Sequence, residues 1–147
     1  MQNKYEKMLE RKAKIEQRKK ELQNQMIGKL GEDIAAKYLE SKGYKILERN
    51  FRCRQGEIDI IASEGVSVIY EQEKPEKIVF VEVKTRKSVS FGTPAEAVTE
   101  AKQKHIKAAT QYYLYSKNIK DTEIRFDVIE IYLTKTRYKL NHILQVF

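Results

Sequence analysis

Three charged side chains interrupt the two most apolar stretches of the sequence. Asp59 lies within Glu57–Ala62, and Glu82 and Lys84 lie within Ile78–Lys84. A buried carboxylate is costly unless it is paired with a cation or bound to a metal ion. Because alternate side chains of a strand share one face, we expect Glu82 and Lys84 to lie side by side. These three residues are the first candidates for chemistry.

The spacing alone leaves two interpretations of this group open. In the first, Lys84 forms a structural ion pair with Asp59 or Glu82. In the second, the two carboxylates hold a divalent cation, because a hard ion such as Mg²⁺ relieves their repulsion and prefers oxygen ligands. The lysine would then orient a water or stabilise developing negative charge. The second arrangement suits phosphodiester hydrolysis, whose transition state is highly anionic.

The hydrophobic pattern predicts the elements that position these residues. Apolar residues at helical spacing indicate a first helix that ends at Gly43, in a left-handed cap position. A second helix is expected to begin at Thr93, with Pro94 in its first turn, and to run to about Lys117. A loop is expected at 71–77. Six strands are expected, at 44–51, 57–62, 66–70, 78–84, 124–133 and 140–147. This order predicts an α/β domain with one mixed sheet flanked by helices.

The chain carries a clear excess of positive charge. Its 147 residues include 29 Lys and Arg against 21 Asp and Glu, a formal net charge of +8. Such an excess favours nucleic acid or an anionic membrane surface as a partner. One cysteine and two histidines exclude an internal disulfide and a zinc site built from Cys and His. No apolar run approaches the ~20 residues of a membrane span, and the charged N-terminus is unlike a signal peptide, so we expect a soluble cytoplasmic protein.

The first 25 residues carry half of that charge. They hold eight Lys and Arg against four Asp and Glu, and they are rich in good helix formers. Met8, Ile15 and Leu22 recur every seven residues. Lys12 and Lys19 interrupt the other core position of these heptads, which makes a poor coiled-coil seam. Three interpretations stay open: a solvated helical extension, a coiled coil that forms a homodimer, and a nucleic-acid-binding arm. We expect a mainly electrostatic role.

The order of the charged motifs resembles that of a known nuclease fold. An acidic residue on one strand followed by Glu-x-Lys on the next is similar to the PD-(D/E)xK fold of restriction endonucleases and archaeal Holliday-junction resolvases. A larger ordered set of motifs resembles the YraN (UPF0102) family of bacterial proteins. The segments that carry this resemblance are Gly28–Glu32, Gly56–Asp59, Phe80–Arg86 and Phe91–Val98.

The resemblance implies a role for each residue of the charged group. Asp59 and Glu82 match the acidic ligands of a Mg²⁺ or Mn²⁺ ion, with the carbonyl oxygen of Val83 as a third ligand. Lys84 matches the catalytic lysine, and Glu32 matches a helix-borne glutamate that completes the acidic cluster. The implied activity is metal-dependent hydrolysis of DNA, with branched or repair intermediates among the candidate substrates. The alternative is a nucleic-acid-binding module that retains the nuclease fold without cutting.

The resemblance also implies a division of the chain. It begins near Gly28, so we expect a charged helical extension at 1–25 and a restriction-endonuclease-like domain at 26–147. Its mixed central sheet would be flanked by helices.

Basic residues flank both acidic strands and are candidates for contacts with nucleic-acid phosphates. A solvated basic rim is the alternative. The candidates are Arg49, Arg52, Arg54, Arg86 and Lys87.

The second helix carries further charged residues with a less specific pattern. Lys102, Lys104 and Lys107 are expected on its solvated side, and His105 is expected on its apolar stripe.

Overall fold

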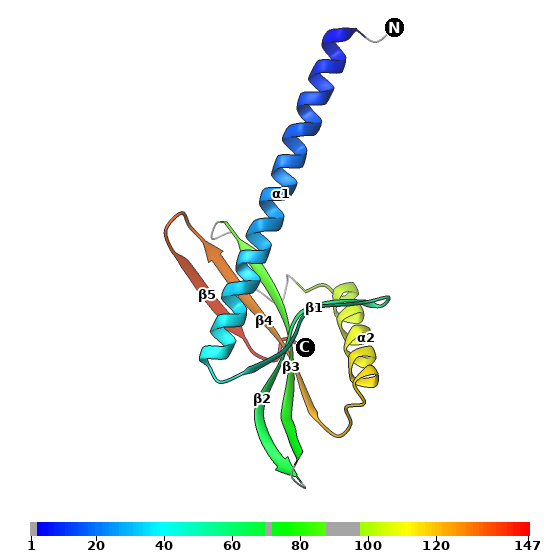
Figure 1. Cartoon of the computed structure of the whole chain (residues 1–147), viewed down its shortest axis with the longest axis vertical. Helices are drawn as coiled ribbons and strands as arrows, with labels where there is room; N and C mark the ends of the chain where they lie inside the picture. Colours follow the sequence, from blue (N-terminus) through cyan, green and yellow to red (C-terminus); the bar gives the residue numbers. More distant parts are fainter. Residues whose placement is uncertain (1–2, 70–71, 88–97) are drawn as a thin grey trace.

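The chain folds around a single mixed sheet in the computed structural model, which describes residues 3–69, 72–87 and 98–147 (Figure 1). The strand order is β1-β2-β3-β4-β5. Strands β3 and β4 are parallel, and the other neighbouring pairs are antiparallel. This arrangement confirms the predicted α/β class. The elements are α1 (Lys4–Ser41), β1 (Lys45–Cys53), β2 (Gly56–Ile69), β3 (Gln72–Arg86), α2 (Glu100–Ser116), β4 (Glu123–Leu133) and β5 (Tyr138–Ile143).

Helix α1 is a continuous helix of 38 residues. A capping box formed by Asn3 and Glu6 starts it, and Gly43, with φ of 88°, follows its C-cap as predicted. The helix passes through Gly28 without a break, so no change of secondary structure marks the expected boundary between 1–25 and 26–147. The burial of the helix changes near this boundary. Every described residue up to Met26 is exposed, and this half of α1 projects from the sheet (Figure 1). No helix in the described part of the chain is long and apolar enough to cross a membrane.

The hairpin of β2 and β3 is longer than predicted. The two strands expected at 57–62 and 66–70 form one strand of 14 residues, and the described part of the expected loop at 71–77 belongs to β3. Pro75 pairs with Val66 across this hairpin. Pairing of β3 with β4 begins only at Lys77. Pro75 therefore lies where β3 has a free edge, which is where a strand tolerates a residue that cannot donate a backbone hydrogen bond.

The two helices pack against opposite faces of the sheet. Ala35 and Leu39 of α1 share a cluster with Val81 of β3. Ala109 and Tyr113 of α2 lie in a second cluster, whose other members include Ile58 and Phe80. Neighbouring residues of β3 thus face different helices, as strand geometry requires. Both faces of the central strands are covered.

The start of α2 differs from the prediction. The helix begins at Glu100, and its N-cap is Thr99, whose side chain accepts a hydrogen bond from the Lys102 amide. The predicted cap at Thr93 is therefore wrong, and the residues around Thr93 lie outside the described ranges. The buried side of the helix also differs from the prediction and carries Ile106, Ala109 and Tyr113. His105 is exposed and its Nδ1 lies 3.0 Å from the Gln55 carbonyl oxygen, so the prediction of a core histidine is also wrong.

Candidate active site

Strand β2 separates from β3 at Asp59. The pairing of the two strands ends at Ile60 and Val81, whereas β3 stays paired with β4 as far as Arg86. The Val83 amide on β3 donates instead to Oδ2 of Asp59 at 2.8 Å. The carboxylate thus replaces the strand partner that β2 no longer supplies, and this hydrogen bond fixes Asp59 beside β3.

Glu82 lies on the same stretch of β3 and is contacted by two lysines. Only 8% of the residue is exposed. Its Oε1 lies 3.2 Å from Nζ of Lys84 and 3.4 Å from Nζ of Lys102. The expected proximity of Glu82 and Lys84 is therefore present, in the form of an ion pair.

Lys102 is a residue of this site that the sequence interpretation missed. The prediction placed it on the solvated side of the second helix. In the structure it precedes Ile106 by one turn, and Ile106 continues the buried stripe with Ala109 and Tyr113. The signal was this spacing of three and four residues, whereas the prediction took the apolar stripe through His105.

The site holds an excess of negative charge around Asp59. Burial, followed by the charges of Glu82 and Glu32, raises the pKa of Asp59 to about 7. The Val83 amide and Lys102 oppose that rise in pKa only in part. A buried carboxyl with this pKa binds either a proton or a cation near neutrality. This local charge is the main electrostatic feature of the site.

Helix α1 brings Glu32 to the site through a close contact with β3. A Cβ atom on Gly31 would collide with the Thr85 side chain, so the helix can approach β3 this closely only with glycine there. Glu32 follows directly and is half-buried. Its charge acts on Asp59. Glu32 thus adds negative charge at Asp59 from a third element.

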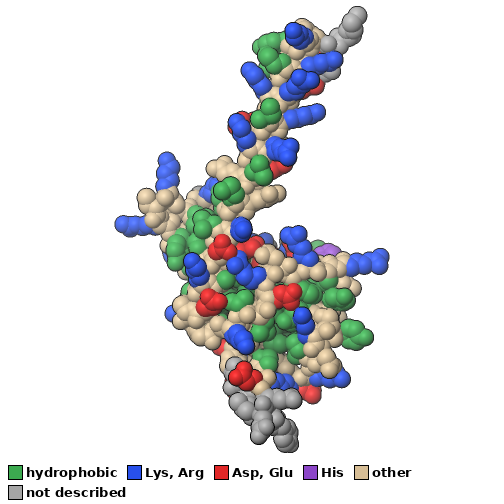
Figure 2. Space-filling view, viewed as in Figure 1, with side chains coloured by type: hydrophobic (Ala, Val, Ile, Leu, Met, Phe, Trp, Pro, Cys, Tyr) green, Lys and Arg blue, Asp and Glu red, His purple; other side chains and the backbone are tan. Residues whose placement is uncertain are grey.

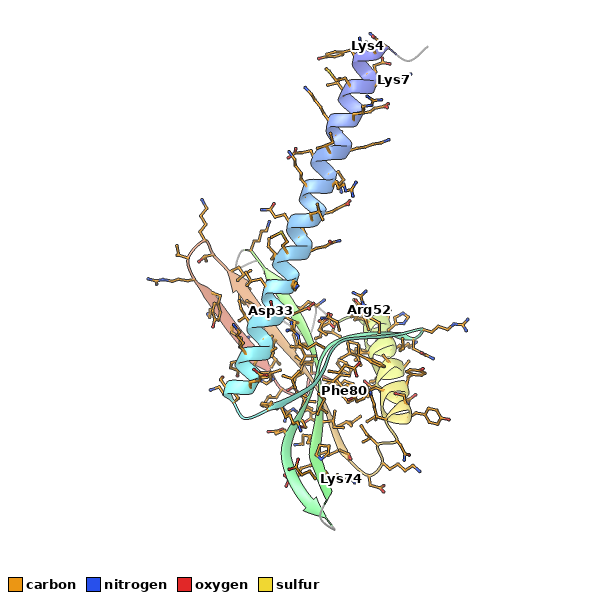
Figure 3. The ribbon with its side chains drawn as sticks, viewed as in Figure 1. Lys4, Lys7, Asp33, Arg52, Lys74 and Phe80 are labelled. Carbon is orange, nitrogen blue, oxygen red and sulfur yellow. The ribbon has the colours of Figure 1, made fainter. Side chains whose placement is uncertain are left out.

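An open groove lies beside Glu32, between α1 and β1. Its basic lining residues include Lys29, Arg49 and Arg52. Arg49 donates to Asp33 of α1 at 2.6 Å. Figure 3 labels Asp33 on the helix and Arg52 on the strand. The groove therefore combines positive charge with one of the candidate acidic residues.

The residues predicted to contact phosphates do not form one cluster. Arg52 is exposed and lies 3.5 Å from Glu57. Arg54 is exposed in the turn of the β1–β2 hairpin. Arg86 is half-buried, and its Nε finds no partner among the described residues. Lys87 is exposed and lies beside the α1 segment that includes Lys19 and Lys20. The groove thus unites two of the five predicted basic residues.

The donor set suits Mg²⁺ better than an ion that needs a full protein cage. Among the described residues, no three Asp, Glu, His or Cys side chains are grouped so that they would hold one metal ion. Asp59 and Glu82 would supply two carboxylates, and the Val83 carbonyl would supply a third oxygen. Mg²⁺ commonly keeps several waters and is bound through one or two carboxylates plus substrate phosphates. The residues present therefore fit such an ion.

Glu130, a further carboxylate on the sheet face that carries Glu82 and Lys84, was not predicted. Glu130 of β4 pairs in register with Lys84 and is 1% exposed. Its Oε2 accepts a hydrogen bond from the Tyr132 hydroxyl at 2.8 Å, and its Oε1 has no partner among the described residues. The acidic surroundings of Lys84 therefore extend onto the neighbouring strand.

Comparison with known proteins places these residues within one family. The model of the uncharacterised protein family UPF0102 matches residues 31–131. A UPF0102 protein of Caldanaerobacter subterraneus is 50% identical over 131 residues, which cover 87% of this chain and 99% of that relative. A UPF0102 protein of Alkaliphilus oremlandii is 48% identical over 126 residues, which cover 84% of this chain and 99% of that relative. A UPF0102 protein of Clostridioides difficile is 44% identical over 126 residues, which cover 86% of this chain and 100% of that relative. Asp59, Glu82 and Lys84 all lie within the matched segment.

Proposed function

The chain belongs to the uncharacterised protein family UPF0102, and from its site we propose that it is a metal-dependent nuclease that hydrolyses DNA. The observation that carries the proposal is the meeting of Asp59 and Glu82 where β2 leaves β3, with Lys84 beside them. Hydrolysis consumes one water and converts one phosphodiester into a phosphate monoester end and a hydroxyl end. Branched and repair intermediates are the candidate substrates.

The two carboxylates would hold the cation. Asp59 is fixed by the Val83 amide, and Glu82 is fixed by its two lysine contacts. A bound Mg²⁺ or Mn²⁺ neutralises charge on the phosphate and makes a water more acidic. The pKa of Asp59, raised to about 7 by burial and by neighbouring carboxylates, supports this role because such a group gains from a cation nearby.

The lysines would act on the phosphate and on the carboxylate. The Lys84 side chain is 31% exposed, so its Nζ can reach a phosphate oxygen without leaving its strand. It would stabilise the charge that develops on that oxygen in the transition state. Lys102 would keep Glu82 in place when Lys84 turns to the substrate. Arg49 and Lys29 of the groove would contact neighbouring phosphates without reading sequence.

One observation favours the second candidate, a nucleic-acid-binding module that does not cut. Lys84 and Lys102 both form ion pairs with Glu82. A structural ion pair of this kind needs no catalysis. The two candidates share the groove and differ in whether the carboxylates bind a cation.

Cleavage assays on the intact chain separate the two candidates. Linear, flapped and four-way DNA would be incubated with Mg²⁺ or Mn²⁺ and wild type, Asp59→Asn or Glu82→Gln. A nuclease cleaves at least one substrate, and both substitutions abolish cleavage while the fold is kept. Glu57→Gln is the matched control, because Glu57 is an exposed carboxylate two residues from Asp59, and its ion pair among the described residues is with the exposed Arg52. Binding without cleavage of any substrate would support the binding module instead.

A further inference from the structure

The projecting half of α1 carries a row of cations on one face. Residues three and four apart on a helix lie on the same side. Every described residue from Asn3 to Met26 is exposed, so this row meets solvent along its full length. Figure 2 shows basic side chains along the projecting helix. The row consists of Lys4, Lys7, Arg11, Lys14 and Arg18.

The same face of α1 continues into the groove beside the candidate site. Gln25 and Glu32 line that groove. They follow Arg18 at intervals of seven residues, as Arg18 follows Arg11 and Lys4. A seven-residue interval drifts by only about 20° around a straight helix. The cation row and the groove are therefore aligned along one side of an unbroken helix.

Two side-chain pairs on the projecting half lie away from this row. Lys19 lies 3.9 Å from Glu16, and Gln17 donates to Glu21 at 2.9 Å. Neither pair includes a member of the row. The row ends at Arg18, and Lys29, which lines the groove, is the next cation along this side of the helix.

We propose that this row is a phosphate-binding track for one arm of a DNA duplex whose other end enters the groove. The proposal rests on the proposed function, because it gives that site a substrate with an extended duplex arm. The distance along the helix from Glu32 to Lys4 is about 42 Å at 1.5 Å per residue. That length corresponds to about 12 base pairs at 3.4 Å each.

The track is a feature of this chain beyond the family's common part. The family model begins at residue 31. The Caldanaerobacter relative matches 87% of this chain along 99% of its own length, so part of this chain has no counterpart there. A second copy of the chain is the competing occupant of the helix. Lys12 and Lys19 break the apolar seam that such a coiled coil would need, so charge complementarity favours DNA.

Two triple substitutions with equal loss of charge test the track. The first changes Arg11, Lys14 and Arg18 to Gln, and the second changes Lys12, Lys19 and Lys20 to Gln. Both are made in an Asp59→Asn background, so that binding is measured without cleavage. The affinity for a duplex of about 24 base pairs, twice the span of the track, is measured by fluorescence anisotropy across a range of salt concentrations. Circular dichroism checks the helix, and light scattering checks the oligomeric state.

The expected result is specific to the row. The first triple variant should weaken binding at low salt and reduce the slope of log affinity against log salt by about 2.7, that is, about 0.9 for each phosphate lost. The second should reduce that slope by less than about 1. A variant that keeps the charges, Arg11→Lys with Arg18→Lys, should retain the wild-type slope.

Three outcomes would overturn the track. Equal losses in both triple variants would mean that only net charge matters, and unchanged binding in both would mean that the arm does not contact DNA. A dimer that the first triple variant converts to a monomer would identify a second copy as the occupant. Failure of the proposed function looks different: wild type would not cleave DNA, yet binding would still depend on the row. Cleavage that needs Asp59 but binding that ignores the row would refute only the track.

Discussion

Replacing Asp59 by Asn removes an ionisation that the fold opposes. Burial, followed by the charges of Glu82 and Glu32, raises the pKa of Asp59 from 3.8 to about 7. In the unfolded chain this carboxyl loses its proton near its ordinary value of about 3.9. Between these two values the folded state binds more protons than the unfolded state, so stability falls as the pH rises. The stabilisation is full below about pH 4 and is lost by about pH 7.

The size of the effect follows from the shift in pKa. Three pKa units at about 1.4 kcal/mol each give about 4 kcal/mol as an upper limit. Because Asp59 is partly exposed, we expect about 2–4 kcal/mol. Burial acts to raise the pKa of Asp127, but its hydrogen bonds to His142 and Arg125 outweigh burial and lower that pKa. Asp127 therefore changes the stability only below the ordinary pKa range of an aspartate, outside the interval from about pH 4 to 7.

The assay is urea unfolding from pH 4 to 8 in the presence of a chelator. The amide oxygen of Asp59→Asn can still accept the Val83 hydrogen bond, so the variant should gain stability relative to wild type as the pH rises. Glu57→Gln, at an exposed position, should follow wild type throughout. A constant difference between wild type and Asp59→Asn from pH 4 to 7 would refute the reasoning, because it would mean that folding does not perturb this carboxyl.

Three other predictions concern the cation, the lysine and the opposite face of the sheet. Mn²⁺ should raise the melting temperature of wild type but not of Asp59→Ala/Glu82→Ala, since a ligand stabilises only the state that binds it; equal shifts would exclude the site. Lys84→Ala should keep the fold and DNA binding but lose cleavage, whereas a stability loss of several kcal/mol would indicate a structural ion pair. Asp127→Ala should cost about 2–3 kcal/mol in urea unfolding, because the buried Arg125 guanidinium keeps Glu64 and Tyr44 but loses the carboxylate that accepts two of its hydrogen bonds. A loss below about 1 kcal/mol would mean that water replaces that carboxylate.

Local rules predicted the parts of the site that lie on one element. Glu82 and Lys84 are two residues apart in an apolar strand, so alternation alone placed them together. Gly43 ended α1 because a left-handed position favours glycine. Membership of UPF0102 was also predicted from motif order, and the comparisons confirm it.

Features that depend on contacts between elements were not predictable in the same way. The separation of β2 from β3 at Asp59 depends on where the β1–β2 hairpin packs, which is against α2. The charges and Pro75 in 71–77 are typical of a loop, but a hairpin that extends beyond its neighbouring strands can expose the same residues. Lys102 was missed because the predicted buried stripe of the second helix ran through His105, whereas the stripe that packs on the sheet runs through Ile106, Ala109 and Tyr113.

The separation of β2 from β3 also divides the domain into parts of unequal resistance to opening. The parallel pair of β3 and β4 is continuous from Lys77 to Arg86. The tip of the β1–β2 hairpin is held to α2 by the contact between Gln55 and His105 and by close packing at Gly56. Backbone amides at this tip should exchange with deuterium faster than those of β3, because opening the tip breaks fewer contacts than global unfolding. Asp59 lies at the junction of the two parts, so opening of the tip reaches the candidate site only when the hydrogen bond between the Val83 amide and Asp59 breaks.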